Sequence, residues 1–261
     1  MEEFYYGKES KNFIRYTNLL SERIGKRLHE SRETELRLIE KLFNIEYEIA
    51  NQYVWIMLNA PHIFMMPSKV DILLAAFHKN LLAMYSSLSL TKGGFYGSAR
   101  IIFRHIFEYL MIAKFSSLSE DEKIYESWKN KEAIYFANGV LKKIKTPDNE
   151  IFKIFWNRLN EISHASRTSL QLHIDWDSDK EQIESNLVVL QIFLECNYHL
   201  LNTHVITDSM KWNLNFYFSE RYEKVKELKK DINELFAISR KMICKQERKI
   251  IHNYKKKWNI E

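Results

Sequence analysis

One stretch near the middle of the chain carries several side chains that could act on a phosphate group. The run Gly93 to Leu110, GGFYGSARIIFRHIFEYL, holds Arg100, Arg104, His105 and Glu108 among apolar residues. A histidine exchanges protons near neutral pH, and a guanidinium can stabilise negative charge that develops on a phosphate. A carboxylate beside them can orient either group. The stretch therefore predicts phosphate chemistry that needs no metal.

Helical geometry groups three of these side chains on one face. If the stretch is an α-helix, Arg104 and Glu108 lie about 40° and about 80° around the axis from Arg100. His105 lies farther round, at about 140°. The same face becomes apolar beyond Glu108. We therefore expect the polar group to be partly buried, because a solvated face would stay polar.

Partly buried ions require partners, since an isolated ion is costly in a low dielectric. Arg104 and Glu108 are four residues apart and are expected to pair within the helix. Arg100 and His105 then need a partner from another helix or from a ligand. The glycines before the helix would let a neighbouring backbone, or a phosphate, approach its start. A structural alternative is an Arg–Glu clamp that fixes helix register in a non-enzymatic interaction or scaffold protein.

A second Arg and His occur later, in FWNRLNEISHAS. A proline at the first helical position predicts a helix over 147–163, which contains Arg158 and ends just before His164. His164 falls on the side opposite the apolar stripe of this helix. We expect it to complete the Arg104–Glu108 group from a different helix. The alternative is a surface histidine favoured by the helix dipole.

Both Arg–His spacings, Arg100-x4-His105 and Arg158-x5-His164, resemble the R-x(4–6)-H motif of the HEPN superfamily of α-helical nucleases and nucleotide-binding domains. The resemblance implies an HEPN-like core in which Arg and His act together on the RNA 2′-hydroxyl and the scissile phosphate. It also implies that no metal takes part and that the site forms across a homodimer interface. In this chain an apolar residue follows each Arg, where the family prefers a polar one.

The first stretch and FWNRLNEISHAS together also resemble a family of uncharacterised bacterial helical proteins with an Arg-x3-Glu helix and a later helix-end His. On that resemblance the matching residues are Arg104, Glu108 and His164, with Ser166 nearby and Asn160 where the family has Ser. Such proteins are often associated with phage defence. The resemblance implies a defence or toxin setting, in which a regulatory partner protein would be expected.

A metal site is the alternative of a different chemical class. Three segments combine Glu and His at helical spacing: Glu161-x2-His164, His105-x2-Glu108 and Glu195-x3-His199. Only the first has the Glu-x2-His order of di-iron bundles, which need two such motifs and two further inward Glu. We therefore expect no metal and no other cofactor, and a carboxylate–His metal-binding bundle remains an alternative.

The elements that position these residues are predicted to be helices throughout. The chain has 261 residues, 28% of them charged, but only six Gly and three Pro, and a sheet protein of this length needs more turn residues. We expect an all-α bundle of about seven to nine helices in a single domain, 1–261. Its parts would be an N-terminal helix over 10–29, a core bundle over 33–207 and a basic C-terminal helical region over 208–261. Within the core, SLSEDE predicts a helix from 119 to about 143.

The setting is predicted to be cytoplasmic and away from membranes. The N-terminus, MEEFYYGKESKNF, is charged where a signal peptide would be apolar. No run approaches the roughly 18 apolar residues of a transmembrane helix. The two cysteines, Cys196 and Cys244, lack metal-ligand spacing and indicate a reducing compartment.

The C-terminal region is strongly basic. From Arg240 to Lys257 it contains eight Lys or Arg and one Glu, interleaved with apolar residues. Such segments are typical of nucleic-acid binding, although a solvated helix with a lysine tail has the same composition. An RNA or nucleotide partner is therefore predicted from the site and from this region together.

Overall fold

The computed structural model describes residues 13–59, 69–118, 122–132, 134–143, 156–157, 159–160, 179–202 and 217–257. In these ranges the chain forms six α-helices, a few π and 3₁₀ turns, and no β-strand. The prediction of an all-α protein is therefore confirmed for the described residues. None of these six helices is both long enough and apolar enough to cross a membrane.

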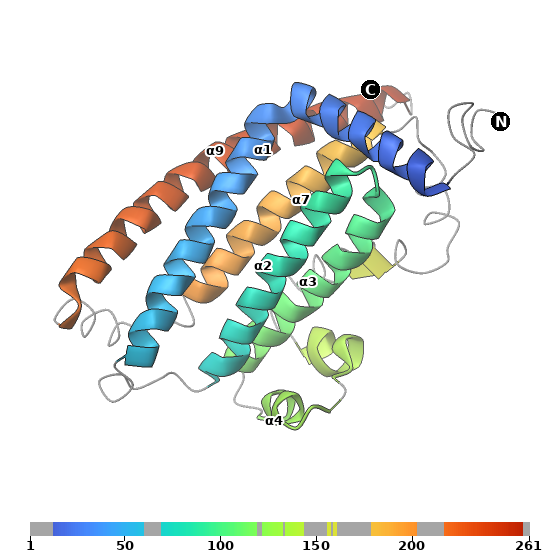
Figure 1. The fold of residues 1–261 in the computed structure, drawn as a ribbon. Helices are drawn as coiled ribbons and strands as arrows, with labels where there is room; N and C mark the ends of the chain where they lie inside the picture. The colour runs from blue at the N-terminus through green and yellow to red at the C-terminus, as the bar shows by residue number, and fades with distance from the viewer. Residues whose placement is uncertain are drawn as a thin grey trace.

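Five long helices and one short helix make up the described part of the bundle. Their bounds are α1 Phe13–Asn59, α2 Val70–Lys92, α3 Tyr96–Leu118, α4 Lys123–Lys129, α7 Asp179–Leu200 and α9 Ser219–Lys257. Figure 1 shows α9, α1, α7, α2 and α3 running alongside one another, with α4 near one end of α3. Because α7 packs against each of the other four long helices, it is the central element of the bundle.

Helix α1 is kinked at Arg32, where the backbone dihedrals, φ −136° and ψ 23°, leave the helical range. The sequence predicted two separate helices here, one over 10–29 and another from 33. The part of α1 before the kink crosses the ends of α7 and α2 (Figure 1), where Ile24 packs against Gly94. Gly94 has φ +82°, and a Cβ at this position would collide with Ile24. Glycine is therefore required in this turn.

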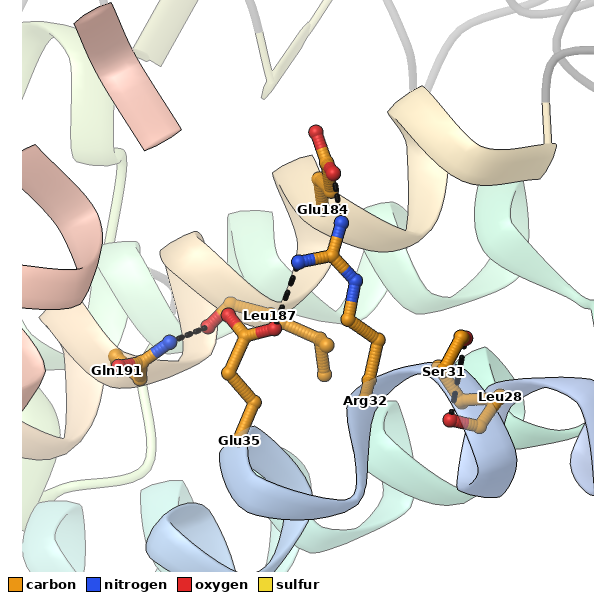
Figure 2. A network of polar contacts seen from close by, with 7 residues as sticks. All are labelled: Leu28, Ser31, Arg32, Glu35, Glu184, Leu187 and Gln191. Carbon is orange, nitrogen blue, oxygen red and sulfur yellow. Dashed lines mark hydrogen bonds and ion pairs between the residues drawn. The ribbon is translucent and has the colours of Figure 1, made fainter. Parts of the chain in front are cut away.

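The kink places Arg32 between two acidic side chains. Its Nη1 lies 3.1 Å from Oε2 of Glu35, and its Nη2 forms a close ion pair with Glu184 of α7 (Figure 2). Both carboxylates are nearly buried, with 3% and 7% of their side-chain area exposed. Since an unpaired charge in such a place is costly, this ion cluster determines how α1 meets the first turns of α7.

Replacing Arg32 by Met is expected to destabilise the fold by roughly 3 kcal/mol, because the buried Glu184 would lose the cation that it contacts. Urea titration at pH 7 measures the free energy of unfolding. The matched control is Arg37→Met, which breaks a pair with Glu33 whose side chains are 69% and 45% exposed. A change within about 0.5 kcal/mol is expected there. Equal losses in the two variants would show that Arg32 contributes no more than a surface charge.

The apolar core lies between the long helices and follows the helical period. Leu73, Phe77 and Met84 of α2 are buried at spacings of four and seven residues. Phe103 of α3 meets Phe193 of α7 edge to face, with ring centroids 5.9 Å apart. Apolar residues that recur at this period place one face of each helix in the core. This local pattern is why the helices were predictable.

Helix α4 is shorter than the sequence predicted. The expected helix ran from 119 to about 143, but α4 ends at Lys129 and residues 136–143 form π and 3₁₀ turns. The helix ends in a Schellman motif. The Lys131 N–H donates to the Trp128 carbonyl at 3.1 Å, and the Glu132 N–H donates to the Ser127 carbonyl at 2.8 Å. Lys131 takes the left-handed conformation that this motif needs, with φ 60°. Gly or Asn usually marks that position, so the sequence carried no stop signal and the prediction was wrong.

Candidate functional site

The candidate site lies on α3, which follows α2 after a glycine turn. Gly93 and Gly94 form the turn, and the Phe95 N–H donates to the Leu90 carbonyl at 2.8 Å. The element that approaches the glycines is α1, because a Cβ on Gly93 would lie 3.0 Å from Oγ of Ser21. The close approach that the glycines permit is therefore used to seat α1 against the α2–α3 turn.

Arg104 and Glu108 form the pair that their spacing predicted. Nε of Arg104 lies 3.0 Å from Oε1 of Glu108, and 25% and 19% of the two side chains are exposed. The expectation of a partly buried polar group is thus confirmed for these two residues. A pair at this depth is screened less by solvent than a surface pair, yet its outer edge remains accessible.

Arg100 is directed to a different partner. Its Nε donates to Oδ1 of Asn186 on α7 at 2.9 Å. Asn186 is fully buried, and its amide nitrogen lies 3.2 Å from Oγ1 of Thr91 and 3.4 Å from the Tyr96 carbonyl. Burial lowers the pKa of Arg100 from its ordinary value, because desolvation disfavours the charged form. Arg100 therefore ties α3 to α7 and to the end of α2.

His105 lies on the exposed side of the same helix. Its side chain is 58% exposed, and its Nδ1 is 3.9 Å from Oε2 of Glu108. Helical angles alone separated His105 from the Arg100 face, but the two carboxylate oxygens of Glu108 reach toward both Arg104 and His105. The structure therefore brings Arg104, His105 and Glu108 together, while Arg100 turns inward.

Trp156 is a site residue that sequence reasoning missed. Its indole N–H donates to Oε1 of Glu108 at 3.3 Å, and the guanidinium carbon of Arg104 lies 6.0 Å from the centroid of its ring. The ring also packs against Phe136, with centroids 5.8 Å apart. A tryptophan in an apolar stripe predicts core packing, and only its polar N–H could have indicated a partner. The segment around Trp156 is thus held against α3.

The second Arg–His motif lies outside the described residues. Both Arg158 and His164 belong to ranges that the structure does not describe. The nearest described neighbours are Trp156, Asn157, Leu159 and Asn160, and of these Leu159 is buried in the core. The predicted contact of His164 with Arg104 and Glu108 therefore stays a prediction.

Two of the three Glu–His pairs considered for a metal lie in the described residues, His105–Glu108 and Glu195–His199. Within the described ranges, no cluster of three or more His, Cys, Asp or Glu could hold a metal ion. Nε2 of His199 lies 3.7 Å from Oε1 of Glu195, but the same oxygen accepts a hydrogen bond from Nε of Arg240 at 2.8 Å. Glu161 and His164 lie outside the described residues.

A buried carboxylic acid in the core was also missed. Glu46 of α1 is fully buried, and its Oε2 accepts a hydrogen bond from the Asn197 amide of α7 at 3.2 Å. Its Oε1, like both amide atoms of the buried Asn80, has no hydrogen-bond partner among the described residues. Burial raises the pKa of Glu46 well above its usual value, and the hydrogen bond from Asn197 opposes this only in part.

The sequence did contain a signal for this group. Glu46 lies four residues after Leu42 and three before Ile49, which are both fully buried. These are the spacings of a core-facing stripe, so the glutamate stands where the helical period expects an apolar side chain. An acidic residue at such a position is expected to be neutral or paired.

The raised pKa of Glu46 predicts a stability difference that depends on pH. The unfolded chain loses this proton above about pH 4.3 while the folded protein keeps it to higher pH, so over that range stability falls as pH rises, by about 1.4 kcal/mol per pH unit at most. In the Glu46→Gln variant the side chain does not titrate, so the stability of the variant lacks this dependence on pH. The variant is expected to be more stable than the wild type at pH 7, by an amount that shrinks toward pH 4.

Urea titrations between pH 4 and pH 8 measure this difference. Glu40→Gln is the control, because Glu40 is half exposed and bonded to Lys92 at 2.7 Å. No stabilisation at pH 7 is expected for that variant. A Glu46→Gln protein less stable than the wild type at pH 7 would contradict the prediction, since it would mean that the fold needs the carboxylate charge.

Taken together, fold and site define an all-α protein in which one helix carries a partly exposed Arg–Glu pair and an adjacent His, and a Trp from another segment contacts the pair. No family model matches the chain, and no curated protein or solved structure matches it. The resemblance to HEPN proteins therefore rests on the sequence motifs alone.

Proposed function

We propose that the protein is an HEPN-like, metal-independent ribonuclease or RNA- or nucleotide-binding protein that acts at the outer edge of Arg104, His105 and Glu108. The observation that carries the proposal is the Trp156 hydrogen bond to Glu108. This bond holds Trp156 at the α3 site. Trp156 stands two residues before Arg158 and eight residues before His164 in the sequence. This contact supports the proposal because Trp156 precedes the second Arg–His motif in the sequence and meets the helix that carries the first.

The partial exposure of the Arg104–Glu108 pair also supports the proposal. Because 25% of the Arg104 side chain remains exposed, solvent reaches part of the side chain despite its pairing with Glu108. Glu108 neutralises one edge of the guanidinium and fixes its orientation. A fixed guanidinium at the surface of a bundle is suited to phosphate, because its planar donors match phosphate oxygens.

In the proposed reaction a histidine acting as general base takes the proton of an RNA 2′-hydroxyl. The 2′-oxygen attacks the adjacent phosphorus, and the bond from phosphorus to the 5′-oxygen of the next nucleotide breaks. A protonated histidine returns a proton to that leaving oxygen, which gives a 2′,3′-cyclic phosphate and a 5′-hydroxyl. Arg104 stabilises the charge on the phosphate oxygens, and His105 and His164 supply the two imidazoles.

The remaining features of the proposal concern assembly and setting. They comprise a bundle of seven to nine helices with an HEPN-like core, a homodimer that brings two sites together, and a role in bacterial defence or as a toxin with a regulatory partner protein. Helix α9 continues to Lys257, so the basic C-terminal residues extend along one helix. Such a helix would bind the RNA backbone through its charges.

The proposal predicts RNA cleavage that persists in EDTA. Purified protein is incubated with total RNA and with defined oligonucleotides, and the product ends are identified as cyclic phosphates. Arg104→Ala and His164→Ala are each expected to lower the cleavage rate by roughly 10²-fold or more, and His105→Ala to lower it as well. Arg37→Ala, which removes an exposed arginine of α1, is the matched control and should cleave at the wild-type rate.

Two other outcomes distinguish the alternatives. Activity lost in EDTA and restored by iron or manganese would favour the carboxylate–His metal-binding bundle. A protein that neither binds nor cleaves RNA, and whose Arg104→Ala variant loses only stability, would favour the non-enzymatic scaffold with an Arg–Glu clamp. The Arg100–Asn186 bond, which ties α3 to α7, is the observation that supports the scaffold.

A further inference from the structure

A second site is suggested by a cavity of about 230 Å³ between α2, α3 and the segment around α4. Its walls are apolar, and Ala75, Ala76 and Ala113 line the side formed by α2 and α3. Trp128 and Ile134, from the segment around α4, also line it. An apolar cavity of about 150 Å³ is enough to bind benzene. The space is therefore sufficient for a small apolar molecule.

The cavity persists because α4 is held to the start of α2 by polar contacts. Tyr125 of α4 donates its hydroxyl hydrogen to Oδ2 of Asp71 at 3.0 Å. Nζ of Lys69 lies 3.0 Å from Oε1 of Glu122 and 5.9 Å from the centroid of the Tyr125 ring. The Trp128 ring stacks on Tyr125, with centroids 6.1 Å apart. These contacts fix the position of Trp128, so the wall of the cavity does not collapse onto α2.

One cation lines this apolar space. Nζ of Lys79 donates to the hydroxyl of Tyr109 and lies 4.2 Å from the centroid of the same ring. Both residues line the cavity, and no described carboxylate pairs with Lys79. Lys79 is exposed to solvent, and its partner here is a neutral phenol rather than a carboxylate. Charge complementarity at this position therefore favours an anion.

We propose that this cavity binds a small apolar carboxylate, with its chain or ring against the alanines and Trp128 and its carboxylate at Lys79 and Tyr109. The ammonium and the phenol hydroxyl both donate hydrogen bonds, so together they match the two oxygens of one carboxylate. The site is separate from the Arg104–Glu108 pair. Its existence does not depend on the proposed ribonuclease function.

The experiment uses ¹⁹F NMR of the full chain labelled with 5-fluorotryptophan. The Trp128 resonance is assigned by its loss in Trp128→Phe. Hexanoate, 1-hexanol and hexylamine are titrated, since they share a chain and differ in the head group. We expect hexanoate to shift the Trp128 resonance and to bind about tenfold more tightly than 1-hexanol, because one hydrogen bond with a charged partner is added. Hexylamine should bind more weakly than either.

Variants identify the side chains that bind the carboxylate and the apolar chain of the ligand. Lys79→Met should reduce hexanoate affinity to that of 1-hexanol and leave 1-hexanol unchanged. Lys226→Met is the matched control, because that lysine also lies over a tyrosine ring, 4.5 Å from the Tyr222 centroid, but on α9. Ala75→Leu, at an exposed position that lines the cavity, should weaken both ligands. Equal binding of hexanoate and 1-hexanol to the wild type, or an unshifted Trp128 resonance at saturating hexanoate, would overturn the proposal.

Discussion

Three charged side chains that lie between helices, Arg32, Glu46 and Arg100, have polar partners on α7. Glu184 of α7 meets the Arg32 cluster at the α1 kink, and Asn186 meets Arg100 of α3. Farther along, Asn197 donates to Glu46 of α1. The first and third contacts hold α1 at two positions along α7, and the second holds α3 at a position between them. Apolar packing tolerates some sliding between helices, whereas a buried polar pair does not, so these contacts set the register of the bundle.

This arrangement separates the roles of the polar residues on α3. Arg100 is committed to Asn186, which leaves Arg104, His105 and Glu108 to form a group at the edge of the bundle. The inner contact keeps α3 from rotating about its axis. A rigid helix is the kind of support that a site for phosphate chemistry needs, because small displacements of catalytic groups are costly.

How much could be predicted depended on the distance in sequence between partners. The Arg104–Glu108 pair followed from the helical period, because residues four apart on one helix are always neighbours. The partner of Arg100 could not be predicted in this way, because Asn186 is 86 residues away and neither segment contains a pattern that identifies the other. The end of α4 was missed for a local reason: Lys131 takes a left-handed conformation without a glycine.

The amino-acid sequence by itself determined that the chain forms helices, which face of each is apolar, and that a polar group interrupts the apolar character of α3. These properties depend on neighbours within one or two turns, and the helical period connects them directly to residue order. Only the tertiary structure decided that Trp156 meets Glu108, that Arg100 turns inward, and that Glu46 is buried against Asn197. Those outcomes depend on how helices are placed relative to one another, because many registers bury the same apolar faces equally well.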